Sequence, residues 1–348
     1  MAYAEAKVYF DGSHYIAIPH TTRPPQKRSQ TFEEYVEVKE IGKSEPQQNS
    51  TPTNIVDVPF AVTEETEAQN DTNLETNVDN SNENEAKPKR YSTRKELFEE
   101  AYRNSLSLPK YKRRKSITDA LRPYFNNEER LKAYVQLNME RKARNLMCRR
   151  IRMTRKANLQ EFNYFCTFTY DGARHTEDSF RQTLKKCLAN LTNRKDWKYM
   201  GVWEKSPEKQ RLHFHGLFYI PEGTMPGLLC TRRDYNFSKK RMVEIYTNTY
   251  FEERLGRNDF EPIEDRYMLG SALAYLMKYI EKSGEKIVYS KGLPPYFISD
   301  IMENDVVCFI GQEENKLLLY DDFLCFDDGI CVGPVSSDTI KHMRKAYE

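Results

Sequence analysis

Two histidines lie one residue apart in a segment that has the composition of a strand. In RLHFHGLFYI, residues 211–220, His213 and His215 flank Phe214. Successive side chains of a strand point to opposite faces, so both imidazoles face the same side. Two neutral imidazoles can hold a divalent metal ion when a third ligand reaches them. The alternative is a pair of histidines that only packs or forms hydrogen bonds.

A carboxylate can reach this pair from the preceding segment. Glu204 ends WKYMGVWE, and the polar turn KSPEKQ joins that segment to the histidine strand. An antiparallel hairpin brings the two strand ends together, so Glu204 is the predicted third ligand. Asp171 and Glu208 are the next candidates, and a surface or turn carboxylate is the alternative interpretation of Glu204.

Two tyrosines recur at helical spacing further along the chain. In AYLMKYIEK, Tyr275 and Tyr279 are four residues apart, and Lys278 and Lys282 each follow a tyrosine by three. Residues four apart share a face of a helix, so both phenols can face one site. The alternative is that the tyrosines belong to the core and the lysines to a solvated helical face.

The elements that must position these residues follow from the sequence pattern. FNYFCTFTY (162–170), WKYMGVWE (197–204), RLHFHGLFYI (211–220) and IVYSKG (287–292) are predicted strands. A helix after the candidate N-cap Thr176 and a helix-rich stretch ending in MLGSALAYLMKYIEKSGEK separate them. The order β-α-β-β-α-β is typical of a ferredoxin-like or RRM-like antiparallel sheet with helices on one face. The expected fold class is α+β.

Segments on either side of this pattern differ in composition. Residues 7–19 alternate around Asp11-Gly12, which predicts a β-hairpin that must pack on another element. We expect five regions in chain order: a hairpin over 1–20, a disordered acidic and polar linker over 21–88, a basic helical region over 89–158, the α+β domain over 159–293, and a small β-rich C-terminal extension over 294–348.

Charge is distributed unevenly along the 348 residues, although 54 Lys and Arg nearly balance 52 Asp and Glu. Residues 44–90 hold ten acidic and three basic side chains, whereas residues 91–160 hold nineteen basic and seven acidic ones. A basic segment of this kind favours a nucleic-acid partner. A solvated helical face is the alternative.

Several classes are disfavoured by composition. The seven cysteines form no Cys-x-x-Cys pair, which indicates reduced thiols in a reducing compartment. No window approaches the roughly 20 apolar residues that a membrane span needs, and the start MAYAEAKVYF lacks signal-peptide features, so we expect a soluble intracellular protein without a membrane partner. No P-loop motif indicates a fused helicase.

Three motifs in order now give a resemblance. Residues 162–292 resemble the replication initiators (Rep) of the HUH endonuclease superfamily, which is named for its His-hydrophobe-His signature. FCTFTYD resembles their first motif, RLHFHGLFYI their metal motif and YLMKYIEK their nucleophile motif. The paired Tyr-x-x-Lys spacing is most similar to rolling-circle replication proteins of microviruses and related single-stranded DNA phages or plasmids. The resemblance covers less than half of the chain.

The resemblance implies an HUH endonuclease fold and an enzyme that nicks and rejoins single-stranded DNA at an origin. Mg²⁺ or Mn²⁺ would be held by the three ligands named above and would polarise the scissile phosphate. A tyrosine would attack phosphorus, leaving a 5′-phosphotyrosine and a free 3′-hydroxyl for rolling-circle replication. Lys278 and Lys282 would neutralise phosphate charge or lower the phenol pKa. If only one phenol reacts, Tyr279 is favoured, because its lysine precedes the turn SGEK.

The resemblance also implies partners. The substrate would be single-stranded DNA or an origin hairpin, with a host helicase and polymerase in the cytoplasm of a bacterial host cell. An unpaired strand needs a basic groove. Its expected contributors lie just before the first motif and are Arg149, Arg150, Arg152, Arg155 and Lys156. An HUH transposase or relaxase, or a nucleic-acid-binding module without catalysis, are the alternative functions.

Overall fold

The computed structural model describes residues 3–20, 35–37, 91–206, 211–236, 240–283, 286–310 and 316–347, with the backbone alone at 35–37, 91, 236 and 281–283. Apart from 35–37, the predicted linker over 21–88 lies outside the described residues. The chain divides into two compact units, residues 1–22 with 139–348 and residues 23–138. Among the described residues, no helix is long and apolar enough to cross a membrane.

The smaller unit is mostly helical. Its elements are β3 (Tyr35–Glu37), β4 (Tyr91–Thr93), α1 (Arg94–Asn104), α2 (Lys110–Leu121) and the 3-10 helix η1 (Arg122–Tyr124), with β3 antiparallel to β4. Thr93 and Glu96 form a capping box that starts α1, because each side chain accepts a hydrogen bond from the other residue's backbone N–H. The long helix α3 (Glu128–Asn158) follows and continues into the larger unit.

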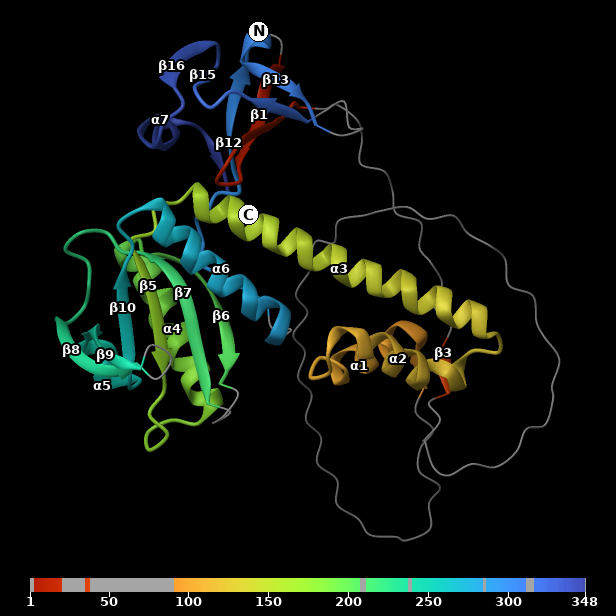
Figure 1. The fold of residues 1–348 in the computed structure, drawn as a ribbon. Helices are drawn as coiled ribbons and strands as arrows, with labels where there is room; N and C mark the ends of the chain where they lie inside the picture. The colour runs from red at the N-terminus through yellow and green to blue at the C-terminus, as the bar shows by residue number, and fades with distance from the viewer. Residues whose placement is uncertain are drawn as a thin grey trace. The chain divides into compact units, whose positions relative to one another are not determined.

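A five-stranded antiparallel sheet forms the centre of the larger unit (Figure 1). Its order is β10 (Asn258–Pro262), β5 (Tyr164–Thr169), β7 (Leu212–Tyr219), β6 (Lys198–Lys205) and β11 (Val288–Tyr289). The histidine strand β7 is therefore central and pairs with β5 and β6 on its two sides. These antiparallel sheets and helices confirm the predicted α+β class.

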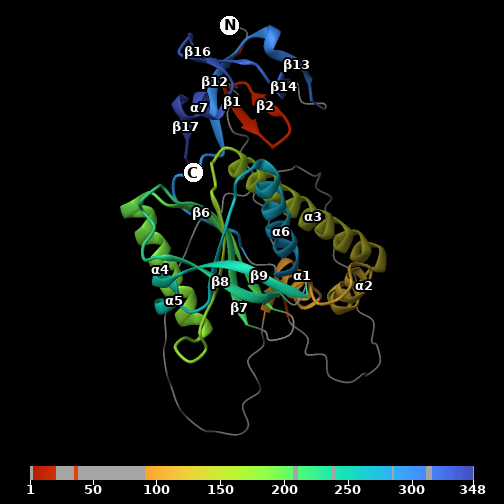
Figure 2. The same cartoon turned by 60° about the vertical axis from the view of Figure 1, so that its left-hand side comes forward.

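Helices cover both faces of this sheet, so the prediction of helices on one face is wrong. α4 (Glu177–Lys195), capped by Thr176, and α5 (Thr249–Arg254) pack on one face, and α6 (Arg266–Ser283) with the end of α3 packs on the other (Figure 2). The physical reason lies in the strands. In β7, Phe214 and Phe218 are buried on the α4 face while Leu217 is buried on the α6 face. A strand with apolar residues on both faces needs cover on both.

The stretch between β7 and α6 also differs from its predicted helix-rich character. It contains a two-stranded hairpin, β8 (Leu229–Asn236) with β9 (Arg241–Asn248), before α5 and β10. Asn248 ties the hairpin to the sheet, since its backbone N–H donates to the buried Asn258 side chain at 2.7 Å. The strand beside β5 is therefore β10, which precedes α6, and β11 after α6 lies at the opposite edge. This arrangement departs from the simple β-α-β-β-α-β order.

The N-terminal hairpin and the C-terminal segment form one further sheet in the same unit. Its order is β13-β14-β2-β1-β12-β15-β16, with β17 also paired to β12. The elements are β1 (Tyr3–Phe10), β2 (Tyr15–Ile18), β12 (Tyr296–Ile301), η2 (Glu303–Asp305), β13 (Val306–Phe309), β14 (Leu317–Leu319), β15 (Leu324–Asp327), β16 (Ile330–Pro334), α7 (Ser337–His342) and β17 (Lys345–Ala346). Val8 lies opposite Phe297, and both are fully buried. The hairpin thus pairs with β12 and not with the central sheet.

Candidate active site

The predicted metal ligands lie side by side on the α6 face of the central sheet. Glu204 on β6 is directly opposite His213 on β7, and two threonines of β5, Thr169 and Thr167, are opposite His213 and His215 respectively. All five side chains belong to the alternation that buries Leu217 against α6 rather than the one that buries Phe214 against α4. Three strands therefore bring these groups to one face.

Each histidine ring is held through its Nδ1 atom by a threonine. His213 Nδ1 lies 2.7 Å from Thr169 Oγ1, and His215 Nδ1 lies 3.0 Å from Thr167 Oγ1. These contacts leave Nε2 of each ring as its remaining polar atom, which is how metal-binding imidazoles are commonly oriented. The sequence placed both threonines on one face of a strand but gave them no role.

Glu204 and His215 form the closest pair of potential ligands. Glu204 Oε2 lies 3.0 Å from His215 Nε2, and the side chains are only 14% and 8% exposed. Two neighbouring ligands of an octahedral ion at about 2.1 Å from the metal also lie about 3.0 Å apart, so this pair fits a divalent ion. Over the described part of the chain, however, no group of three or more His, Cys, Asp or Glu side chains meets at one point. His213 must move to complete such a site.

His213 is uncharged at neutral pH. Burial, followed by the neighbouring His215, lowers the pKa of His213 to about 4, and the Glu204 carboxylate opposes this shift. Arg211 and Arg257 contribute smaller effects in the same direction as burial. A neutral imidazole has a free lone pair, which is the form that binds a metal.

Both tyrosines of α6 contact the histidine face. The Tyr279 ring stacks on His215 at 5.6 Å between centroids and 13° between planes, and the Tyr275 ring meets His215 edge-on at 5.4 Å and 80°. The two tyrosine rings are 4.8 Å apart. Their exposure differs, because Tyr275 is 40% exposed whereas Tyr279 is 8% exposed. The predicted convergence of both phenols on one site is therefore present, with Tyr275 as the accessible one.

Both phenols are protonated in this arrangement. Burial raises the pKa of Tyr279 well above its usual range, and hydrogen-bonding contacts with Tyr275 and Glu204 add to the shift. Burial also raises the pKa of Tyr275, which the hydrogen bond from Tyr279 partly offsets. A nucleophilic phenolate therefore requires a change in the surroundings of these rings, such as a bound cation.

The two lysines of the nucleophile motif do not contact the site in the described residues. Lys278 is exposed, and none of the described hydrogen bonds or ion pairs joins it to the histidines. The side chain of Lys282 lies outside the described residues. Any role of these lysines thus concerns a bound substrate rather than the arrangement of the site itself.

The predicted DNA contacts on α3 are divided by their burial. Arg152 is exposed, and Arg149 and Arg150 are half-buried. The Arg155 guanidinium lies over the Tyr9 ring at 4.4 Å, which gives it a structural contact.

Lys156 corrects the prediction for the last of these residues. Its side chain is 4% exposed, its Nζ donates to the Leu293 carbonyl at 3.4 Å, and it lies over the Tyr289 ring at 4.9 Å. Here α3 enters the core beside Met153 and Ala157, so a lysine on that side cannot reach DNA. Its long stem and paired ammonium fill a structural position instead.

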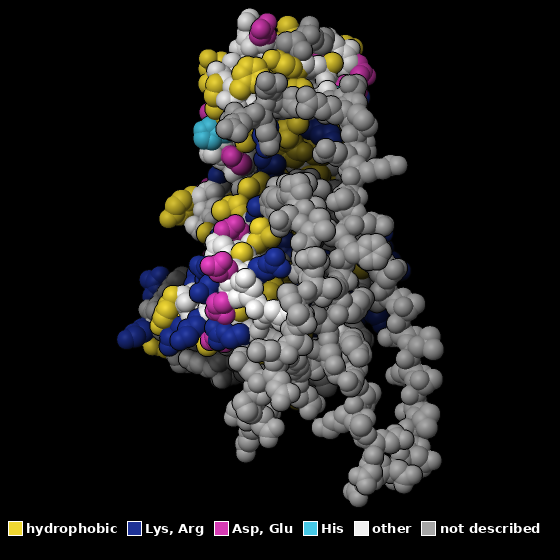
Figure 3. Space-filling model, turned by 90° about the vertical axis from the view of Figure 1, so that its right-hand side faces the viewer, with side chains coloured by type: hydrophobic (Ala, Val, Ile, Leu, Met, Phe, Trp, Pro, Cys, Tyr) yellow, Lys and Arg dark blue, Asp and Glu magenta, His cyan; other side chains and the backbone are white. Residues whose placement is uncertain are grey.

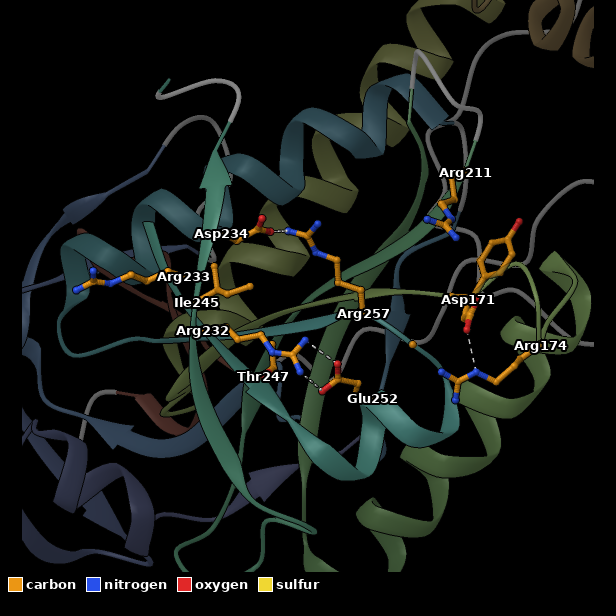
Figure 4. A pocket seen from close by; sticks show the side chains of 12 residues that line it. Asp171, Arg174, Arg211, Arg232, Arg233, Asp234, Ile245, Thr247, Glu252 and Arg257 are labelled. Carbon is orange, nitrogen blue, oxygen red and sulfur yellow. Dashed lines mark hydrogen bonds and ion pairs between the residues drawn. The ribbon is translucent and has the colours of Figure 1, made fainter. Parts of the chain in front are cut away.

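An arginine-lined pocket of about 400 Å³ was missed by sequence reasoning (Figure 4). Its basic lining residues are Arg174, Arg211, Arg232, Arg233 and Arg257, and its acidic ones are Asp171, Asp234 and Glu252. They come from the segment after β5, the start of β7, the β8–β9 hairpin, α5 and the segment before β10. Lys and Arg side chains also gather at the lower left of the face drawn in Figure 3. The only sequence signal was the pair of adjacent arginines in TRRDYN.

Comparison with known proteins gives one match. Residues 163–284 match the family model of the ORF2 type of replication-associated protein. This match supports a role in replication initiation. The matched segment is about a third of the chain and runs from the residue before β5 to the end of α6, so it contains both histidines, Glu204 and both tyrosines. No curated protein and no solved structure matches the chain.

Proposed function

We propose that the chain is a replication initiator endonuclease of the HUH type, which nicks and rejoins single-stranded DNA at an origin. The observation that carries this proposal is the contact of both Tyr275 and Tyr279 with His215, beside the buried Glu204 carboxylate. The replication-associated family match over the same residues supports it. A pair of core tyrosines needs no buried histidine–carboxylate pair beneath it.

The reaction is a transesterification. The phenolate oxygen of a tyrosine attacks phosphorus, the bond from phosphorus to the 3′ oxygen breaks, and the 3′ oxygen leaves as a hydroxyl after taking up a proton. The protein keeps the 5′-phosphate as a tyrosine ester, and a polymerase can extend the free 3′-hydroxyl. Attack by a 3′-hydroxyl on the ester reverses the bond and rejoins the strand. No water is consumed in either step.

Tyr275 is the first nucleophile in this proposal. It is the more exposed phenol and rests against the Phe165 ring at 5.7 Å. Tyr279 contacts Glu204, whose carboxylate can accept the phenol proton. Alternating use of the two tyrosines then requires that Tyr279 become accessible once Tyr275 carries DNA. This order differs from the expectation that Tyr279 is favoured, because exposure and not the neighbouring lysine decides access.

Glu204, His215 and His213 are the residues that would hold Mg²⁺ or Mn²⁺. Such an ion polarises the scissile phosphate and disperses the charge that develops on it. Thr167 and Thr169 keep the imidazoles oriented for that role through their Nδ1 contacts. Lys278 and Lys282 would neutralise phosphates of a bound strand.

The biological setting is proposed on the same basis. The substrate would be single-stranded or hairpin origin DNA of a single-stranded DNA phage or plasmid, inside a bacterial host cell. A host helicase and a host polymerase would supply strand separation and synthesis. An HUH transposase or relaxase would use the same residues on other DNA.

The experiment is a covalent-adduct assay. The protein is incubated with 5′- and 3′-end-labelled single strands from the DNA that encodes it, with Mn²⁺ or with a chelator, and is then denatured. We expect a labelled protein band that requires the metal and carries only the label 3′ of the cut. A matched strand with scrambled sequence is the control. DNA binding without any adduct on either strand would favour a module without catalysis.

A further inference from the structure

The arginine-lined pocket lies at the His213 end of the candidate active site. Arg211 precedes β7 and is two residues from His213. On the other side, the Arg257 carbonyl accepts a hydrogen bond from the Thr169 backbone N–H at 2.8 Å, and Thr169 is the residue that holds His213. Both arginines act electrostatically on His213. The pocket and the histidine face are therefore adjacent.

The charges of the pocket are arranged unequally (Figure 4). Arg232 pairs with Glu252 at 2.8 Å, and Arg174 pairs with Asp171 at 2.9 Å. These two arginines are fastened to the walls.

The remaining guanidinium groups are more available. Arg257 pairs with Asp234, yet its side chain is 66% exposed. The Arg211 guanidinium stacks over the Tyr170 ring at 5.5 Å, and no described ion pair joins it to a carboxylate. Arg233 points away from the other labelled side chains (Figure 4).

We propose that Arg211 and Arg257 bind a backbone phosphate of the single strand that enters the candidate active site, next to the phosphate that is cut. Guanidinium groups bind phosphate oxygens through two parallel N–H bonds, so two of them on one wall can hold a phosphodiester. On binding, Arg257 exchanges Asp234 for the phosphate. The Tyr170 ring under Arg211 offers a face for the adjoining base. This inference rests on the proposed function for its substrate.

A binding experiment without cleavage tests the inference. Fluorescence anisotropy of a labelled oligothymidylate of roughly 15 nucleotides is measured over a range of salt concentrations, with chelator present. We expect Arg211→Ala and Arg257→Ala each to weaken binding roughly tenfold and to reduce the salt slope by about 0.7. Arg233→Ala is the matched control and keeps the wild-type affinity and slope.

A second variant predicts the opposite sign. Asp234→Asn removes the competitor for Arg257, so binding should tighten roughly two- to fivefold, the range expected for an exposed ion pair. If the Arg257–Asp234 pair were only structural, this variant would bind DNA no more tightly than wild type. An oligonucleotide with uncharged methylphosphonate linkages should abolish the difference between wild type and Arg211→Ala.

The outcomes separate this inference from the proposed function. Wild-type affinity and salt slope in both arginine variants would overturn the pocket assignment, even if the protein cuts DNA. Arginine-dependent binding by a protein that forms no covalent adduct would support the pocket and overturn the nickase. Equal loss in Arg233→Ala would show a diffuse basic surface and would also overturn the assignment.

Discussion

Replacing Thr169 with valine isolates the role of the hydroxyl that holds His213. Valine keeps the shape of the side chain and favours a strand, so the change removes little besides the 2.7 Å contact with His213 Nδ1. Thr169 is 7% exposed, and water therefore cannot easily replace the lost partner. Leaving a buried polar atom without a hydrogen bond costs about 1–3 kcal/mol of folding free energy.

The functional effect should exceed the effect on stability. Loss of a residue that orients a ligand typically lowers metal affinity or activity by about 10–100-fold. We expect the Mn²⁺ concentration for half-maximal adduct formation to rise by that factor in Thr169→Val, with much of the rate recovered at high Mn²⁺. Initial rates at a series of Mn²⁺ concentrations measure this, and a thermal melt checks the fold.

Thr169→Ser is the matched control, because it retains the hydroxyl and should behave like wild type. A wild-type Mn²⁺ requirement in a folded Thr169→Val protein would refute the reasoning. It would mean that the orientation of His213 does not matter and that the metal is held by other groups.

The structure makes three further predictions. His215→Ala should abolish adduct formation while DNA affinity stays within about twofold, because phosphate-binding side chains supply the affinity; normal cleavage in this variant would contradict the site. Lys156→Ala should lower the urea midpoint of unfolding without changing the salt slope of DNA binding, whereas Arg152→Ala should leave stability unchanged and reduce that slope by about 0.7 if it contacts a phosphate. Gly201→Ala should destabilise the sheet by about 1–3 kcal/mol, since a Cβ there would lie 2.5 Å from the Phe214 ring; an unchanged urea midpoint would show that this ring can move aside.

The site was predictable where it depends on local periodicity. The two-residue repeat placed both histidines on one face of β7, and the four-residue repeat placed both tyrosines on one face of α6. A hairpin then brought Glu204 to the end of β7, directly opposite His213. Side-chain conformation was beyond this reasoning, because the Glu204 carboxylate contacts His215, the residue diagonally across.

Features that depend on distant segments were not predictable. The arginines of the pocket come from segments between residues 174 and 257, and only the fold brings them together. Lys156 carries the same charge as Arg152, but its side of α3 faces the core. The β8–β9 hairpin was missed because its charged residues hide the alternation, and nothing local marks β12 as the partner of the N-terminal hairpin.

The central claim is that a tyrosine of α6 becomes covalently attached to DNA. It is tested most directly by digesting the adduct formed with the chain's own coding DNA and Mn²⁺, and mapping the phosphotyrosyl peptide by mass spectrometry. We predict nucleotides on Tyr275 in wild type and on Tyr279 in Tyr275→Phe, with no adduct when both are replaced by phenylalanine. An adduct on any other residue, or one that persists in the double variant, would contradict the account.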